Sequence, residues 1–236
     1  MRTYVRHLPH WRQEGVTYFV TFRLADSLPQ SRLRELDAMR AKWDEAVLRL
    51  PGNDALLRQA SDVEDPHTLQ VDARHRPPWD EAVLRQNGYR QMMERVERWL
   101  DEGYGSCLLR EPFAADCLER KLRHFDGEQY DLDAFVLMPN HVHLLVRPYS
   151  DKEHPLERLE QAWKAYSSRE INLARGTQGS LWQTESFDRI VRDEEHLFRC
   201  IQYIGSNPRR AGLSPSETRR WIRPDWAAAG WSFADP

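Results

Sequence analysis

Two histidines separated by one residue are the feature of this sequence best suited to chemistry. His141 and His143 flank Val142 at the start of an apolar run that is typical of a β-strand. Residues i and i+2 of a strand share a face, so the two imidazoles lie side by side while Val142 points into the core. Because the pair follows a turn at a strand end, we expect it to be exposed. Two imidazoles suit a divalent metal and leave coordination positions open for phosphodiester oxygens, although the same spacing also occurs in merely half-buried polar pairs.

One nucleotide-hydrolysing class also places alternating histidines on a strand. Histidine-triad proteins need a third histidine at the next alternate position. That position is Leu145 here, which excludes this class.

Two tyrosines on helices downstream of the histidines are candidate nucleophiles, and helical periodicity separates them. Tyr166 is in step with the apolar residues of its helix, so we expect it in the core. Tyr203 lies outside the apolar stripe of the last helix. This position is compatible with a catalytic tyrosine and with an ordinary surface tyrosine. The stripes are Leu156, Leu159 and Trp163 in the first helix, and Leu197, Phe198, Ile201 and Ile204 in the last.

Asn207 stands one helical turn after Tyr203, where its side-chain carbonyl could complete the metal site. Pro208 follows directly and is expected to end the helix. On spacing alone, a helix-terminating Asn-Pro pair explains Asn207 better than a metal ligand does.

The elements that must position these residues alternate between strands and helices. The short turn Pro139-Asn140 between two strand-like runs indicates an antiparallel pair, and Asp193 is a good N-cap for the last helix. The pattern predicts an α+β fold with helices packed against an antiparallel sheet. We expect strands over 17–24, 106–109, 132–138 and 141–146, and helices over 31–50, 80–100, 114–125, 155–173 and 194–204.

Composition limits the protein to one substantial core, or one domain with a long insertion. The chain has 236 residues, of which 40% are apolar. No run reaches the roughly 18 apolar residues of a membrane span, and the first residues lack the apolar segment of a signal peptide. The odd count of 3 cysteines, without a CxxC spacing, indicates reduced thiols in a cytosolic protein that fill the core.

Charge is distributed unevenly along the chain. The net charge of −3 does not indicate a nucleic-acid binder. The segment 209–223, however, carries several arginines against the single acid Glu217, and a local basic patch can bind phosphates whatever the overall charge. A solvated basic tail is an equally good interpretation. The stretch 61–80 is rich in proline and charge, and we expect it to be an exposed linker.

Taken together, these residues resemble the single-tyrosine HUH transposases, in particular the REP-associated tyrosine transposases of bacteria. HUH denotes His–hydrophobic–His, here His141-Val142-His143. The resemblance covers about Thr17 to Leu213 apart from an insertion. Its motifs are Gly103-Tyr-Gly-Ser-Cys107, His124-Phe-Asp-Gly127, Phe135-Val-Leu-Met-Pro-Asn-His-Val-His-Leu-Leu-Val146, Trp163-Lys164, Ile171-Asn172, Leu181-Trp-Gln183, Phe187-Asp-Arg189, Arg192-Asp-Glu-Glu-His196 and Tyr203-Ile-Gly-Ser-Asn-Pro-Arg-Arg-Ala-Gly-Leu213.

The resemblance implies a fold and a set of roles. It implies one ferredoxin-like HUH endonuclease domain over 1–213, with a mostly helical insertion at about 37–102 and a C-terminal tail over 214–236. Tyr203 would be the nucleophile and would form a 5′-phosphotyrosine. The ligands of a divalent metal, Mg²⁺ or Mn²⁺, would be His141, His143 and Asn207; relatives often carry Gln at the third position.

The implied partner is single-stranded DNA or a DNA hairpin of the REP type, a short palindrome. We expect a transposase-like endonuclease and strand transferase in the bacterial cytoplasm, associated with the nucleoid, without a membrane partner, and either monomeric or dimeric. The candidate DNA contacts, each of which could equally be an ordinary surface or core residue, are Lys164, Arg169, Arg192, Arg209 and Arg210 for the backbone and Trp182 for base stacking.

Two alternatives remain open at the level of sequence. A replication-initiator or relaxase nickase belongs to the same HUH group, but such proteins frequently carry paired tyrosines or a helicase domain, neither of which is seen here. A non-catalytic protein that binds repeat hairpins is the other alternative.

Overall fold

The computed structural model describes residues 2–5, 9–48 and 79–233. The chain divides into two compact units, Met1–Ser27 with Leu100–Pro236 and Leu28–Trp99. The second unit therefore begins earlier than the insertion expected at about 37–102. A linker was expected over 61–80. Its residues 61–78 lie outside the described residues, and residues 79 and 80 begin helix α3 (Trp79–Asp101).

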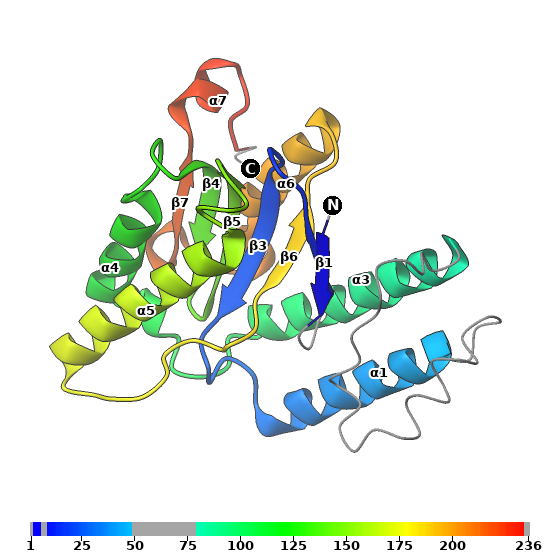
Figure 1. Cartoon of the computed structure of the whole chain (residues 1–236). Coiled ribbons are helices and arrows are strands. Elements are labelled where there is room, and N and C mark those ends of the chain that lie inside the picture. The colour runs from blue at the N-terminus through cyan, green and yellow to red at the C-terminus, as the bar shows by residue number, and fades with distance from the viewer. Residues whose placement is uncertain (1, 6–8, 49–78, 234–236) are drawn as a thin grey trace. The chain divides into compact units, whose positions relative to one another are not determined.

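A five-stranded antiparallel sheet forms the centre of the first unit (Figure 1). Its strand order is β6-β3-β5-β4-β7, and β5 is the middle strand. The chain order β3–α4–β4–β5–α5–β6 is the βαββαβ pattern of ferredoxin-like folds, to which β7 adds an edge strand. The expected α+β fold is thus confirmed. The strands are β3 (Tyr18–Arg23), β4 (Tyr130–Leu137), β5 (His141–Pro148), β6 (Phe187–Ile190) and β7 (Arg219–Ile222).

Helices cover both faces of this sheet, and each face has its own core (Figure 1). Helices α4 (Pro112–Arg123) and α5 (Leu156–Arg175) share the larger core with Val142 and Leu144. Helix α6 (Glu194–Arg210) packs on the other face, against Leu145. Side chains alternate along a strand, so β5 presents His141 and His143 to the α6 face and Val142 to the opposite face. The sequence predicted this arrangement.

Helix α6 extends beyond its expected end at Ile204. The Asp193 side chain caps its first turn by accepting a hydrogen bond from the His196 backbone N–H, as expected. The expectation that Pro208 stops the helix was wrong, because Pro208 lies buried inside the last turn. The backbone carbonyls of Asn207 and Pro208 still accept hydrogen bonds. The Ala211 N–H donates to Asn207, and the Leu213 N–H donates to Pro208.

The strand expected over 106–109 was also wrong. Leu108–Arg110 is a 3₁₀ helix, reached through the left-handed conformations of Gly103, Gly105 and Cys107, which turn the chain too sharply for a strand. Two four-residue strands, β6 and β7, were not expected. The remaining elements are β1 (Arg2–Val5), β2 (Pro9–Arg12), α1 (Gln30–Leu48), α3 (Trp79–Asp101), the 3₁₀ helix Pro215–Glu217 and α7 (Pro224–Ala228).

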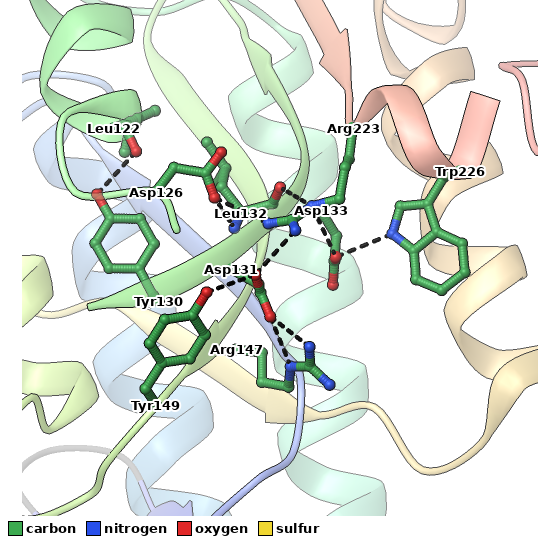
Figure 2. A network of polar contacts seen from close by, with 10 residues as sticks. All are labelled: Leu122, Asp126, Tyr130, Asp131, Leu132, Asp133, Arg147, Tyr149, Arg223 and Trp226. Atoms are coloured by element: carbon green, nitrogen blue, oxygen red, sulfur yellow. Dashed lines mark hydrogen bonds and ion pairs between the residues drawn. The ribbon is translucent and has the colours of Figure 1, made fainter. Parts of the chain in front are cut away.

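The segment expected as a tail over 214–236 contributes to the domain through its described residues, 214–233. Its strand β7 pairs with β4, and Arg223 then bridges three carboxylates, one in the turn before β4 and two at its beginning (Figure 2). The Arg223 guanidinium lies 2.9 Å from both Asp126 and Asp131 and 3.6 Å from Asp133. The indole N–H of Trp226 on α7 donates to Asp133 at 2.9 Å. The fold therefore continues past residue 213.

Within the Leu28–Trp99 unit, both expected helices are present as α1 and α3. They are joined by an ion pair between Glu35 and Arg95, and the guanidinium of Arg32 lies 5.2 Å from the centre of the Trp99 ring. None of the described helices has the length and apolar character needed to cross a membrane. The cysteines Cys107, Cys117 and Cys200 are unpaired and buried, as expected.

Candidate functional site

The histidine pair lies at the start of the central strand, facing α6. The Nε2 atoms of His141 and His143 are 3.1 Å apart. The two side chains are only 1% and 0% exposed, so the expected exposure at a strand end was wrong. Neighbouring strands on both sides of β5 and the overlying α6 explain this burial.

The outer nitrogen of each ring is held by its own partner. His141 Nδ1 lies 2.8 Å from Asn140 Oδ1, and Asn140 Nδ2 donates to the backbone carbonyls of Leu100 and Tyr104. Those donations fix the Asn140 amide, so its oxygen must accept from His141 Nδ1–H. The Nε2 atom of His141 therefore presents a lone pair to the centre of the site.

His143 has a partner that permits either tautomer. Its Nδ1 lies 2.7 Å from Thr21 Oγ1, a hydroxyl that can donate or accept. While His143 Nε2 donates to His141 Nε2, Thr21 donates to His143 Nδ1. If both Nε2 lone pairs face a cation, Nδ1 carries the proton and Thr21 accepts it. Sequence reasoning missed Thr21 because only the β3–β5 register places it opposite His143.

Both imidazoles are neutral near pH 7. Burial lowers the pKa of His141 to about 3 and that of His143 well below its ordinary value. Repulsion from His141, Arg189 and Arg210 lowers the pKa of His143 further. Neutral imidazole is the form that can bind a metal.

Tyr203 lies directly against the histidine pair. Its ring meets the His143 ring edge-on at 5.4 Å and the Phe19 ring at 5.7 Å, measured between centroids. The side chain is half-buried and packs on the α6-side core, so the expectation that it turns away from the core was wrong. The buried face of α6 is rotated relative to the expected stripe, because Phe198 is 42% exposed.

Asn207 is fully buried, one turn after Tyr203 on the same helix. Among the described residues, neither its Oδ1 nor its Nδ2 has a hydrogen-bond partner. A buried amide without partners is unfavourable by about 1–3 kcal/mol, so the position calls for a ligand. This observation favours a metal ligand over the helix terminus that the spacing suggested.

The donor set fits a divalent metal through these residues. In the described ranges, His, Cys, Asp and Glu side chains form no group of three or more suited to hold a metal. The available donors are therefore the two Nε2 atoms and the amide oxygen of Asn207. Nitrogen donors of this kind accept Mn²⁺, and the oxygen also suits Mg²⁺.

The alternative tyrosine lies elsewhere. Tyr166 is 53% exposed on α5, with Lys121 Nζ 4.7 Å from its ring centre, so its expected place in the core was wrong. The buried position of that helix turn is Ser167, whose hydroxyl binds the Trp163 carbonyl. The helix α5 lies on the face of the sheet opposite to the histidines.

Two of the candidate DNA contacts have structural roles. Trp182 is 3% exposed, and its indole N–H donates to Ser167 Oγ, so it offers no stacking surface and that expectation was wrong. The Lys164 ammonium donates to the Gln183 and Thr184 carbonyls and to Ser186 Oγ. It holds that loop to α5.

The other basic candidates are exposed. Arg169 lies on α5, away from the histidine face, and Arg192 precedes α6. Arg209 and Arg210 end α6 and are exposed. The rest of the basic segment is engaged within the protein: Arg219 with Asp116 and Glu119, Arg220 with the Gly205 carbonyl, and Arg223 with its three carboxylates.

Comparison with known proteins adds one structural neighbour. No protein-family model matches the sequence, and no curated protein matches it. Among solved structures, the chain is similar to one described as the REP-associated tyrosine transposase bound to a REP hairpin. The sequence identity is 13% and the TM-score 0.41, over 91% of this chain and 76% of that chain.

Proposed function

We propose that this protein is a metal-dependent endonuclease and strand transferase for single-stranded DNA, with Tyr203 as nucleophile. The observation that carries the proposal is the contact of the Tyr203 ring with His143, whose Nε2 faces that of His141. The buried amide of Asn207, one helical turn from Tyr203, supports it.

The chemistry is a transesterification at phosphorus. The Tyr203 hydroxyl attacks a backbone phosphate, so that the Tyr203 Oη–P bond forms while the P–O3′ bond breaks. Overall, the phenolic proton passes to the departing 3′ oxygen, which yields a 5′-phosphotyrosine and a free 3′-hydroxyl. Attack by a 3′-hydroxyl on the phosphotyrosine reverses the step and joins strands without a nucleotide cofactor.

The residues around Tyr203 prepare this attack. A phenol is a weak nucleophile near neutral pH because little of it is ionised. A divalent metal held by His141, His143 and Asn207 would supply Lewis-acid polarisation of the phosphate. Phe19 and His143 pack on the Tyr203 ring and fix its position, which reduces the entropy lost on reaching the reactive geometry.

The proposed substrates are hairpins of the REP type. This choice rests on the motifs around His141 and Tyr203, which resemble those of the REP-associated tyrosine transposases. Trp182 is buried, so bases cannot stack on it. Stacking on Trp182 therefore gives no reason to expect a preference for single-stranded DNA. The paired Nε2 atoms are equally compatible with other single-stranded targets.

The test is covalent adduct formation on labelled single-stranded hairpins in Mg²⁺ or Mn²⁺. Tyr203→Phe, which removes only a hydroxyl, is expected to abolish the adduct and leave hairpin binding within about tenfold. Tyr166→Phe is the matched control and should remain fully active, since its ring is exposed. His143→Ala should also abolish cleavage.

Each outcome decides between functions. A DNA-linked peptide containing Tyr166, or an adduct from Tyr203→Phe, would overturn the assignment of the nucleophile. A mobility shift without any adduct from the unmodified protein would establish a hairpin-binding protein instead.

A further inference from the structure

Two arginines from different elements flank the tyrosine–histidine cluster. Arg189 of β6 lies directly across from Phe19 of β3, and its Cζ is 4.6 Å from the centre of the Phe19 ring. Arg210, two helical turns after Tyr203, places its Cζ 4.9 Å from the centre of the Tyr203 ring. Each guanidinium thus lies over an aromatic face.

The two aromatic rings belong to one contact set. Phe19 and Tyr203 are 5.7 Å apart, and Phe19 lies 5.5 Å from His143, which itself contacts Tyr203. The two guanidinium groups therefore lie at the two ends of a continuous cluster that contains the nucleophile and one metal ligand.

Among the described residues, neither arginine has a carboxylate within ion-pair distance, although Asp101 attracts Arg210 from farther away. Arg219 and Arg223, in contrast, form ion pairs. The hydrogen bond found for Arg189 is a weak one, with Nη2 4.0 Å from Cys200 Sγ. A guanidinium stacked on a ring keeps its N–H edge available, and that edge matches the oxygens of a phosphate.

Positive charge on Arg189 and Arg210, beside the rings of Phe19 and Tyr203, favours an anion there. Both side chains are also exposed and can meet an incoming strand.

We infer that Arg189 and Arg210 bind the non-bridging oxygens of the DNA phosphates that lie against Tyr203, one arginine on each side of its ring contacts. Arg210 would in addition pack on the Tyr203 ring, 4.9 Å from its centre. The inference rests on the proposed function, because the bound strand is the one that Tyr203 attacks. It adds Arg189, a residue of the sheet, to the DNA contacts.

The salt dependence of DNA binding tests the inference without requiring cleavage. The probe is a fluorescein-labelled oligothymidine, for which log Kd is measured against log[KCl] with the full chain. Each phosphate contact contributes a slope of about 0.7 on single strands. We expect Arg189→Gln and Arg210→Gln each to reduce the slope by about 0.7, and the double variant by about 1.4. Arg210→Lys keeps the charge and should keep the slope.

Arg199→Gln is the matched control. Arg199 is exposed on α6 and pairs with Glu195 at 2.5 Å; among the described contacts it lies over neither Phe19 nor Tyr203, so its substitution makes the same charge change without touching the two rings. Its slope should equal that of the unmodified protein. Unchanged slopes for Arg189→Gln and Arg210→Gln, in proteins with unchanged circular dichroism, would overturn the inference, as would an equal decrease for Arg199→Gln.

Adduct formation on hairpins separates this inference from the proposed function. With both correct, Arg189→Gln and Arg210→Gln form the adduct at least about tenfold more slowly. Lower slopes together with no adduct from the unmodified protein would retain the phosphate-binding arginines and reject the nuclease. Normal adduct rates and normal slopes in both variants would retain the nuclease and reject the arginines.

Discussion

At the scale of single residues, the Thr21 hydroxyl accommodates either tautomer of His143. The Nδ1–Oγ1 distance of 2.7 Å is short enough for a hydrogen bond in either direction. Thr21 can therefore follow the change of tautomer that a metal between the two Nε2 atoms requires. Asn140 cannot, since its amide is fixed by two backbone carbonyls.

We expect Thr21→Val to weaken Mn²⁺ binding by about tenfold or more, because partners of a metal-binding histidine orient the ring and its lone pair. The change keeps the shape of the side chain and removes only the hydroxyl. Isothermal titration of Mn²⁺ into the purified protein measures it. Thr17→Val, the same change just before β3, is the control; equal affinities in all three proteins would contradict the role given to Thr21.

Asp101 provides a second prediction at this scale, through pH. Burial raises the pKa of its carboxyl to about 6, against the opposing attraction of Arg210. An unfolded aspartate titrates near ~3.9, so between roughly pH 4 and 6 the folded protein holds a proton that the unfolded chain has lost. Its contribution to stability therefore falls as the pH rises through that window, and stays lower above it.

Asp101→Asn should consequently be more stable than the unmodified protein at neutral pH, by about 1–3 kcal/mol. The difference should disappear near pH 4. Urea unfolding at both pH values measures it, with Glu102→Gln as the exposed neighbouring control. Parallel pH profiles for the unmodified protein and Asp101→Asn would show that burial does not perturb this carboxyl.

The placement of a single side chain was predictable from the sequence where buried positions are apolar and exposed positions are polar. The shared face of His141 and His143 follows from strand alternation alone. The tyrosines were placed wrongly because α5 buries Ser167 and α6 buries Gly205 and Asn207, which no apolar stripe marks. Ser167 lies in the core because two hydrogen bonds satisfy it, a tertiary effect that the sequence pattern does not contain.

At the scale of elements, α6 is held in place by the segment that follows β7. The Phe233 side chain packs on Gly205. A β-carbon built at Gly205 would lie 2.6–2.8 Å from three Phe233 atoms, one of which is the Phe233 β-carbon. Arg220 donates to the Gly205 carbonyl at 2.8 Å and lies over the Phe233 ring. Glycine thus permits a close approach one half-turn from the nucleophile.

This contact predicts that Gly205→Ala has opposite effects on stability with and without the Phe233 ring. Gly205→Ala should destabilise the protein by about 1–3 kcal/mol, because the methyl group overlaps Phe233. In a Phe233→Ala background, the same change should stabilise by up to about 1 kcal/mol, since alanine favours a helix over glycine. Thermal unfolding of the four proteins measures both effects. Stabilisation by Gly205→Ala in both backgrounds would rule out the close packing.

Elements were predictable where their periodicity was long and regular. The hairpin of β4 and β5 and the helices α4, α5 and α6 follow from apolar patterns of eight residues or more. The edge strands β6 and β7, Phe187–Ile190 and Arg219–Ile222, are short and half charged, so they have no alternation to detect. Only their neighbours β3 and β4 make them strands.

At the scale of the whole molecule, the sheet topology brings distant residues into one site. The site lies where the middle strand β5 is covered by helix α6. It combines Phe19 of β3, the two histidines of β5 and Tyr203 of α6. From α6 the chain continues to β7, which closes the sheet beside β4. The C-terminal segment therefore docks against the helix that carries Tyr203.

The Arg223 network is the strongest candidate for that docking (Figure 2). Arg223 is 20% exposed and neutralises Asp131 and Asp133, which are 10% and 7% exposed; Arg147 and the Tyr149 hydroxyl also bind Asp131. Burial raises the pKa of Asp133, against the attraction of Arg223, whereas hydrogen bonds from Arg147, Tyr149 and Arg223 outweigh burial and lower that of Asp131. Removal of Arg223 would leave neighbouring carboxylates without their shared cation.

We therefore expect Arg223→Met to lower the free energy of unfolding by about 3 kcal/mol, the range for breaking a buried pair on one side. Arg219→Met is the matched control, because Arg219 is 34% exposed and pairs with Asp116 and Glu119 nearer the surface, where an ion pair contributes about 1 kcal/mol or less. Urea unfolding measures both. Adding Asp133→Asn to Arg223→Met should recover part of the loss, since it removes one of the unpaired charges. Equal losses for Arg223→Met and Arg219→Met, or no recovery in the double variant, would show that the C-terminal segment is held by the apolar contacts of β7 and Phe233 instead.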